Sequence, residues 1–574
     1  MKTYSIFPFY RFACLTCLTF LHVIHVFSQN VEQVIKAKPV TVNGGINLSG
    51  TGYAQSGGNS RRDPFSYQMS ANLNFNFFGI IDAPFSASMT SENKTFNRPS
   101  YGQFGISPSY KWITVHAGWR NMEFSSYTFS GTTFFGGGIE LQPETFPLRG
   151  KIVYGRFAKK TVQGDTISSY ISEPVYNRYG FGAMVSAGPL KNSVDLIIFR
   201  AEDEHDDKIV FFDSIPITPQ ENLTIGISTR QQLGKYFNLA IQYAISAYTD
   251  DTRAGVKEFT TFSYLNNLGP FYTPRYSSRH SSVYDLQLNF QADIFTIGLA
   301  YKRIDPSYQS MGTLFLNNDT EDIQVNASTS ILQKKMSLSG SVGIQRDNLD
   351  NRQSTKNSRI TGSINSSYQV SQNMSVSMNY SNFNSTAEPT RVLIQDSIKY
   401  IQISQNFSVS GNYSMGGETF GHVYNLMYSR QTVNTINSNF TDVERTGTIM
   451  NNVTAGYRLN YKPADAGISL SFNLTHYGQD SIVNYNYGPQ LSANKSLFDK
   501  KLRTSLSYSL QSSQSNTSND SYVNVFRLTA GYSYKSHHSL SFNTSLMMRS
   551  TQPVGKERTK SKELVSTLSY SYSF

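Results

Sequence analysis

The chain has 574 residues, a formal net charge of +11 and a mean hydropathy of −0.36, yet 13% of its residues are aromatic. Its basic residues are scattered, without a dense cluster, which argues against nucleic acid as a partner. Both cysteines, Cys14 and Cys17, lie in an N-terminal stretch that we expect to be removed, so we expect neither a disulfide framework nor a cysteine-ligated metal.

The first 28 residues predict a secretory signal peptide. Positively charged residues accompany an apolar stretch at 12–27, and small residues precede Gln29. The alternative is an uncleaved anchor helix, but the apolar run is short and two histidines interrupt it. Residues 29–40 follow as a polar tail, which we expect in the periplasm.

Apolar and polar residues then alternate from about Thr41 to the C-terminus. The segment FSYQMSANLNFNFF at 65–78 shows the pattern near the start, and LVSTLSYSYSF at 564–574 shows it at the end. A period of two residues is that of a β-strand, whose successive side chains point to opposite faces. Each segment therefore has one apolar face and one polar face.

Two architectures hide alternate residues from water: a sandwich of two sheets, and a transmembrane barrel whose apolar face contacts lipid. Connection lengths favour the barrel, because short connections such as 534–539 alternate with long ones such as 384–398 and 432–445. We predict an all-β fold over residues 41–574: a transmembrane antiparallel up-and-down β-barrel of about 26 strands, within a range of about 22 to 28.

These features resemble the large outer-membrane β-barrel proteins of Gram-negative bacteria, of the Bacteroidetes type. The resemblance rests on the Ser-Gln junction after the signal, the alternating body rich in Tyr, Asn and Ser, and the last strand that ends on Phe574. It implies contact with outer-membrane lipid and insertion by the barrel-assembly machinery. In that family the last strand resembles an assembly signal, which here would comprise Leu568, Tyr570, Tyr572 and Phe574. Alternatively, these are side chains that any lipid-facing strand favours.

Tyrosines on the apolar parity predict two aromatic girdles, one at each membrane surface. Tyr461, Tyr532 and Tyr534 fall at the periplasmic ends of their strands. The second girdle, nearer the outer ends, comprises Tyr380, Tyr428 and Tyr508.

Two further groups of residues are candidates for a role in the pore. Arg458, Arg503 and Arg527 take the inward parity, where they would favour anionic solutes or pair with inward acids. The connection LNNLGPFYTPRYSSR at 265–279 is a candidate constriction over the barrel mouth, or a ligand loop, and the alternative is a surface loop folded on itself. Its candidate residues are Phe271, Tyr272, Arg275 and Tyr276.

No catalytic, cofactor or metal site is predicted. His422 and His476 share the outward parity, but the topology places them at opposite membrane surfaces, so they cannot serve one Ser-His site. The acidic run EDEHDD at 202–207 could gather a hard cation but lacks the spaced ligands of a calcium loop, and a solvated charge run is the alternative. NNDTED at 317–322 and RDNLDN at 346–351 read as loop turns.

The predicted function is an outer-membrane channel or translocation component with a polar lumen. A barrel of this size encloses a wide space, so we expect loops or a partner, either a plug or a periplasmic or lipoprotein subunit, to fill it. The alternative is a surface binding or structural scaffold whose outer loops engage glycans or proteins. We expect no enzyme activity.

Overall fold

The computed structural model describes residues 38–58, 60–91, 103–144, 146–160, 176–204, 218–390, 399–438, 443–516, 520–552 and 557–574. The predicted signal peptide and most of the predicted tail lie outside these residues. Within the described ranges, no helix is long and apolar enough to cross a membrane.

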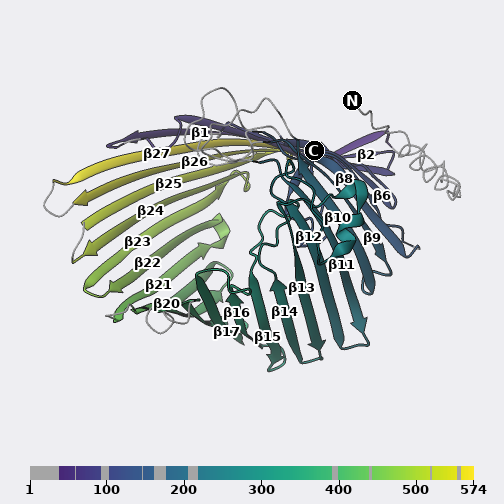
Figure 1. The fold of residues 1–574 in the computed structure, drawn as a ribbon. Coiled ribbons are helices and arrows are strands. Elements are labelled where there is room, and N and C mark those ends of the chain that lie inside the picture. The colour runs from purple at the N-terminus through teal and green to yellow at the C-terminus, as the bar shows by residue number, and fades with distance from the viewer. Residues whose placement is uncertain are drawn as a thin grey trace.

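The alternating segments form strands, joined by short turns, longer loops and three short 3-10 helices (Figure 1). The elements in chain order are β1 (Val40–Ser56), β2 (Phe65–Phe77), β3 (Ile81–Thr90), β4 (Gln103–Ile106), β5 (Ser109–Tyr110), β6 (Ile113–Asn121), β7 (Thr133–Leu141), β8 (Leu148–Ala158), β9 (Arg178–Ala187), β10 (Ser193–Asp203), β11 (Glu221–Leu233), β12 (Phe237–Thr249), η1 (Ser263–Asn267), η2 (Gly269–Phe271), β13 (Ser278–Gln291), β14 (Phe295–Ile304), β15 (Thr320–Ile331), β16 (Met336–Asp347), β17 (Thr355–Ser371), β18 (Met374–Pro389), β19 (Lys399–Gly416), β20 (Phe420–Ser438), β21 (Val443–Tyr461), η3 (Lys462–Ala464), β22 (Ala466–Gln479), β23 (Ile482–Leu497), β24 (Leu502–Ser515), β25 (Asp520–Tyr534), β26 (His538–Gln552) and β27 (Thr559–Ser573).

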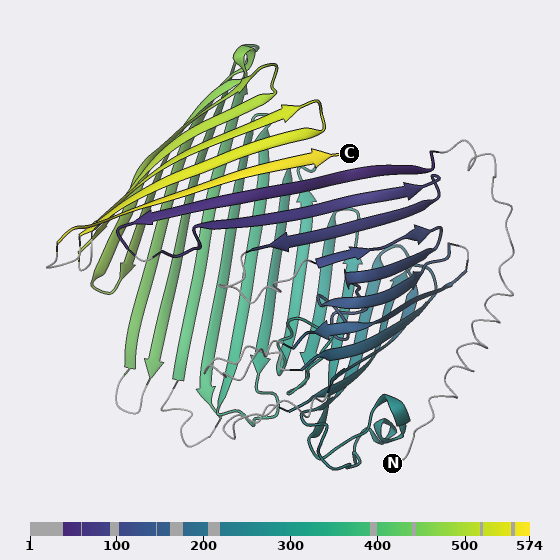
Figure 2. The same cartoon turned by 90° about the horizontal axis from the view of Figure 1, so that it is seen from above.

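Each strand pairs antiparallel with its neighbours, and the last strand returns to the first. β27 pairs with β1 from Gly45 opposite Ser573 to Ser56 opposite Lys562, which closes the barrel (Figure 2). The short strands β4 and β5 both lie between β3 and β6 and share one position in the wall. The structure is thus a closed barrel with 26 strands around its wall, which confirms the predicted fold class.

The register places large apolar side chains of neighbouring strands side by side on the outer face. Leu568 of β27, for example, lies opposite Phe542 of β26 and Gly50 of β1, and all three residues have the apolar parity of their strands. Leu568 is 51% exposed and Leu426 is 59% exposed, although both are large and apolar. A complete band of such side chains around the outer face is what lipid would cover.

Connections divide between the two ends of the barrel. Most short connections, such as 535–537, lie at one end, the turn end, and the long ones lie at the other, the loop end; the two-residue connection 480–481 at the loop end is an exception. The predicted loops 384–398 and 432–445 are shorter than expected, because β18 continues to Pro389 and β20 to Ser438. Residues 384–388 of β18 are mostly polar on both faces, which hides the period of two in the sequence although the backbone still pairs with β19.

Candidate functional site

Two loop-end connections fold into the barrel instead of out into solvent. We call residues 122–132, between β6 and β7, the first inward loop, and residues 305–319, between β14 and β15, the second inward loop. Phe129 of the first packs with Phe199 of the inner wall, and Tyr308 of the second packs with the inward-facing Val283. Both loops therefore occupy the lumen side of the wall.

The inward loops are hydrogen-bonded to each other through their backbones. The N–H of Ser130 donates to the carbonyl of Gly312 at 2.9 Å, and the Ser310 hydroxyl donates to the carbonyl of Thr128 at 2.7 Å. The Tyr308 hydroxyl donates to the carbonyl of Tyr127 at 2.8 Å. The partner groups lie about 180 residues apart in sequence, so these bonds need the strands between the two loops to be in place.

The wall supplies further partners to each loop. The Tyr127 hydroxyl donates to Oδ2 of Asp285 on β13 at 2.6 Å. The N–H of Met311 donates to Oδ1 of Asn222, a residue of β11 with no exposed surface. Buried polar groups without partners cost free energy, so satisfied bonds of this kind favour the docked loops over a detached state.

An aromatic cluster anchors the first inward loop. The ring of Phe129 stacks on Phe199 with centroids 5.1 Å apart, and meets Phe124 and Phe157 edge-on at 5.2 and 5.5 Å. Stacked and edge-to-face rings are favourable arrangements in a dry core. An apolar cluster of this kind would be unfavourable on a wall that faces water. The cluster therefore identifies the part of the lumen that the first inward loop fills.

Glycines in the wall make room for these rings. One glycine from each of five neighbouring strand positions lies in a row across the inner face: Gly105, Gly118, Gly136, Gly155 and Gly180. A Cβ on Gly136 would lie 2.5 Å from the Cα of Gly155, and a Cβ on Gly180 would lie 2.9 Å from the Phe157 ring. Glycine within strands allows this close approach and bends the wall around the cluster.

Two tyrosine hydroxyls at the centre of the loop contacts are shielded from water. Burial raises the pKa of Tyr127 above its ordinary value, and the adjacent Asp285 carboxylate raises it further. Burial alone raises the pKa of Tyr308. Both hydroxyls therefore stay protonated and act as hydrogen-bond donors at any physiological pH.

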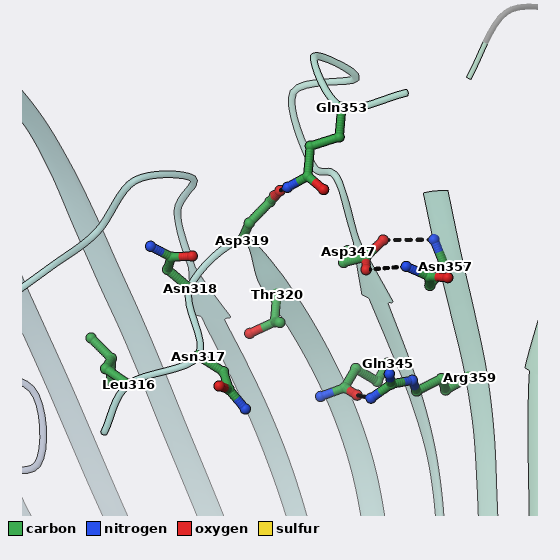
Figure 3. A pocket seen from close by; sticks show the side chains of 10 residues that line it. All are labelled: Leu316, Asn317, Asn318, Asp319, Thr320, Gln345, Asp347, Gln353, Asn357 and Arg359. Atoms are coloured by element: carbon green, nitrogen blue, oxygen red, sulfur yellow. Dashed lines mark hydrogen bonds between the residues drawn. The ribbon is translucent and has the colours of Figure 1, made fainter. Parts of the chain in front are cut away.

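The second inward loop borders a polar cavity of about 300 Å³ at the loop end, the upper cavity (Figure 3). Oδ1 of Asp319 accepts from the N–H of Leu349 at 2.8 Å, and Asp347 accepts two hydrogen bonds from Asn357 at 2.6 Å. Arg359 donates to Gln345 at 3.2 Å. The turns NNDTED and RDNLDN, predicted as loop-end connections, contribute to this cavity.

A second cavity, the lower cavity, has a volume of about 390 Å³ and lies against the first inward loop. Its sides come from inward-facing residues of β8 to β12, and the loop contributes Glu123, Phe124, Ser125 and Ser126. Three basic side chains line it: Arg149, Lys151 and Arg230. Two carboxylates, Glu123 and Asp195, line it as well.

The opposite part of the inner wall is lined by small polar side chains. Hydroxyls pair across neighbouring strands at 2.7 Å between Ser377 and Ser410, and at 2.9 Å between Thr51 and Thr567. Asn379 likewise donates to Asn365. These short side chains leave space in the lumen and satisfy one another without an apolar core, as a water-facing wall requires.

The loop predicted as a constriction lies elsewhere. Residues 250–277, the outer-wall loop, place Tyr272 and Leu265 against Leu223 of β11, which has the outward parity of Ile227. The helices η1 and η2 accordingly stand outside the ring of strands (Figure 2). The constriction proposed for Phe271, Tyr272, Arg275 and Tyr276 is therefore wrong, because the apolar side chains of this loop cover an apolar patch of outer wall. Binding of a ligand by the loop stays a prediction.

The remaining predicted residues occupy the faces expected of them. Arg458, Arg503 and Arg527 lie on the inner face, where Arg458 donates to Oδ1 of Asn460 at 3.0 Å and no ion pair to a described residue involves any of the three. All six girdle tyrosines lie on the outer face. Whether they contact headgroups, and whether the arginines act on solutes, stay predictions.

The last strand also has the predicted orientation. Leu568, Tyr570, Tyr572 and Phe574 share the outer face. The N–H of Phe574 donates to the carbonyl of Gly44 at 2.9 Å, and its ring meets Tyr572 edge-on at 4.7 Å. Recognition by the assembly machinery stays a prediction.

Other candidates behave as structural residues. His422 is hydrogen-bonded to the Tyr457 hydroxyl and His476 to Asn451, near opposite ends of the barrel. Of the acidic run 202–207, residues 205–207 lie outside the described residues, and Glu202 pairs with Arg200. Among the described residues no group of three potential ligands could hold a metal ion.

The sequence did contain a signal for the inward loops. Met122, Phe124, Tyr127 and Phe129 crowd into a short connection, where an exposed loop would carry mostly polar residues. The lengths of the connections carry no information on this apolar content, so they do not identify 122–132 as a loop inside the barrel.

Solved structures with a similar arrangement are bacterial outer-membrane proteins. The P pilus usher (PapC) translocation pore superposes with a TM-score of 0.37 at 10% identity, covering 93% of this chain and 99% of the usher pore. The FrpB iron transporter from Neisseria meningitidis superposes with a TM-score of 0.36 at 11% sequence identity, covering 93% of this chain and 81% of the transporter. OccAB4 of Acinetobacter baumannii superposes with a TM-score of 0.28 at 7% sequence identity, covering 66% of this chain and 97% of OccAB4. The first of these is a translocation pore and the second an iron transporter. No protein-family model and no curated protein matches the sequence.

Proposed function

We propose that this chain is an outer-membrane channel for small polar solutes, narrowed from within by its own two inward loops. The apolar outer face provides the lipid-facing surface, and the inner face of Ser, Thr and Asn provides a water-filled path. The observation that carries the proposal is the docking of the inward loops inside the closed wall.

Loops inside the lumen can give a barrel of large diameter a narrow, selective passage. A wall of 26 strands would enclose a large hole, since barrel diameter grows with strand number. The first and second inward loops lie side by side and are bonded to both each other and the wall, so they reduce the passage without a separate plug domain.

Single-channel recording in planar bilayers tests this function. The wild-type protein should insert and conduct in discrete steps, and replacing residues 307–313 of the second inward loop by a Gly-Ser linker should increase the unit conductance at least about twofold, since it removes material from the lumen. A matched control shortens the outer-wall loop over residues 258–272, which lies outside the wall, and should leave the unit conductance unchanged.

Silent insertion of both proteins would contradict the channel and favour the alternative, a surface scaffold. One observation supports that alternative: Tyr276 is 71% exposed on the outer-wall loop, where an aromatic ring could stack on a glycan or contact a partner. Glycan-array binding that is lost in Tyr276→Ser, combined with silent insertion, would establish the scaffold instead.

A further inference from the structure

We propose that the lower cavity binds a small organic carboxylate, held by Arg149 and Arg230. This inference rests on the proposed channel and names the class of solute that the channel takes. The upper cavity is not part of it.

The register places the cavity residues opposite one another at one level of the wall. Across β8 to β12, these are Arg149, Ser186, Asp195, Ser228 and Gln242. Arg230 follows Ser228 on β11, two residues nearer the turn end, and lies opposite Ser193. All of them line the lower cavity. A band of inward polar groups therefore faces one space.

The two arginines are available for a ligand, whereas their neighbour is not. Lys151 is engaged, because its Nζ lies 3.5 Å from Oε1 of Glu140 and donates to the carbonyl of Glu123 at 3.1 Å. Nε of Arg149 is buried and has no hydrogen-bond partner. Arg230 likewise forms no ion pair or side-chain hydrogen bond with any described residue. The guanidinium groups of Arg149 and Arg230 line the cavity and have no hydrogen bond or ion pair to a described residue, so they can donate to a ligand that carries acceptors.

Guanidinium chemistry selects the kind of acceptor. An arginine presents parallel N–H groups that match the two oxygens of a carboxylate, and hydrogen bonds between charged groups are about twice as strong as neutral ones. Arg149 on β8 and Arg230 on β11 stand three strand spacings and two residues along the strands apart, about 16 Å between their backbones. With both side chains extended inward, they can hold the two ends of a short dicarboxylate.

Asp195 lies between the two arginines and sets a limit on the charge of the ligand. Its Oδ2 accepts from the Ser228 hydroxyl at 2.9 Å, but no cation among the described residues pairs with it. The Asp195 carboxylate repels an anion whose negative charge is concentrated at one point. The cavity therefore favours a solute with a negative charge at each end and an uncharged middle. A volume of about 390 Å³ is within the range of small-molecule sites.

The first inward loop holds the solute in place. Ser125 and Ser126 add polar groups to the cavity, and Phe124 and Leu141 add apolar surface for a hydrocarbon chain. A solute bound here lies against the loop that narrows the channel, so its residence would be visible in the ionic current.

Glutarate, a five-carbon dicarboxylate, is the probe for this site. We expect it to block the single-channel current of the wild-type protein, and Arg149→Gln or Arg230→Gln to raise the half-blocking concentration about tenfold each, as loss of a charged hydrogen bond predicts. Asp195→Asn should lower that concentration, because it removes a repelling charge. Misfolding could explain a loss of affinity in the arginine variants, but it cannot explain a gain of affinity in Asp195→Asn.

The control is Arg549→Gln, which removes the same charge from the inner face of β26, away from the cavity. It should change the half-blocking concentration less than about twofold. An equal effect of Arg549→Gln, or unchanged block in both cavity variants, would overturn the site.

Calorimetric titration of detergent-solubilised wild-type protein with glutarate separates the two proposals. Binding without conductance refutes the channel and keeps the site, whereas conductance without block or binding refutes the site and keeps the channel.

Discussion

The hydroxyl of Tyr127 donates a 2.6 Å hydrogen bond to Oδ2 of Asp285, which joins the first inward loop to β13 across the lumen side of the wall. Both residues are buried, and the carbonyl of Tyr127 also accepts a hydrogen bond from the Tyr308 hydroxyl. Tyr127 thus joins the first inward loop to β13 through its hydroxyl and to the second inward loop through its backbone carbonyl.

Tyr127→Phe should loosen the first inward loop without unfolding the barrel. The change leaves the Asp285 carboxylate short of a buried donor, which costs about 1 to 3 kcal/mol in loop docking. We expect more frequent transitions to a larger conductance level in planar bilayers. Tyr477→Phe is the control, because its hydroxyl donates to Gln479 on another part of the inner wall and to no other residue in the described ranges. Identical traces for the two variants would rule out the role of Tyr127.

Docking of the inward loops should weaken at alkaline pH. The pKa values of Tyr127 and Tyr308 are raised in the docked state, so a detached loop releases protons more readily. Docking is therefore fully stable below the ordinary tyrosine pKa of about 10 and weakens as pH rises above it. Single-channel conductance should increase above about pH 10. A flat response to pH 11 in the wild-type protein would contradict this linkage.

Phe129→Ala should release the first inward loop to proteases. Truncating a fully buried phenylalanine costs about 3 to 5 kcal/mol, and here the loss falls on loop docking because the ring contacts Phe124, Phe157 and Phe199. Limited proteolysis followed by mass spectrometry should locate new cleavage within residues 122–132. In the control Phe271→Ala, on the outer-wall loop, that segment should stay resistant.

Gly136→Ala should impair folding of the barrel itself. A Cβ at this position would lie 2.2 Å from the carbonyl oxygen of Tyr154, so the backbone of β7 or β8 must move. Gly531→Ala is the matched control on the inner face of β25, where a Cβ meets no atom within 4 Å. The fraction that shows heat-modifiable migration in SDS-PAGE should fall in the first variant only. Equal yields would show that the glycine row tolerates side chains.

Phe574→Ala distinguishes an assembly signal from an ordinary lipid-facing aromatic. If the last strand is read during insertion, this variant should reach the outer membrane several-fold less than the wild-type protein, measured by membrane fractionation. Phe542→Ala removes an aromatic ring from the same outer face on β26 and should be inserted normally. Equal loss in both variants would support the simpler lipid-contact explanation.

The local sequence was sufficient to predict the strands of the wall and which of their side chains face outward. The period of two from Thr41 onward fixes which side chains face outward, because a strand must alternate its faces and only lipid or a second sheet can cover the apolar one. The same alternation placed Arg503 and Arg527 inward and Tyr532 and Phe574 outward, and it predicted a strand number that the structure confirms.

Only the tertiary structure decided where the loops go. Leu265 to Arg279 covers the outer wall, while 122–132 and 305–319 enter the lumen, although all three are loop-end connections with aromatic residues. Their positions depend on partners far away in sequence, such as Asn222 for Met311 and Asp285 for Tyr127. Alternation is a local property of the chain, whereas the burial of a loop depends on the concave surface that the closed wall, bent at its glycine row, presents to it.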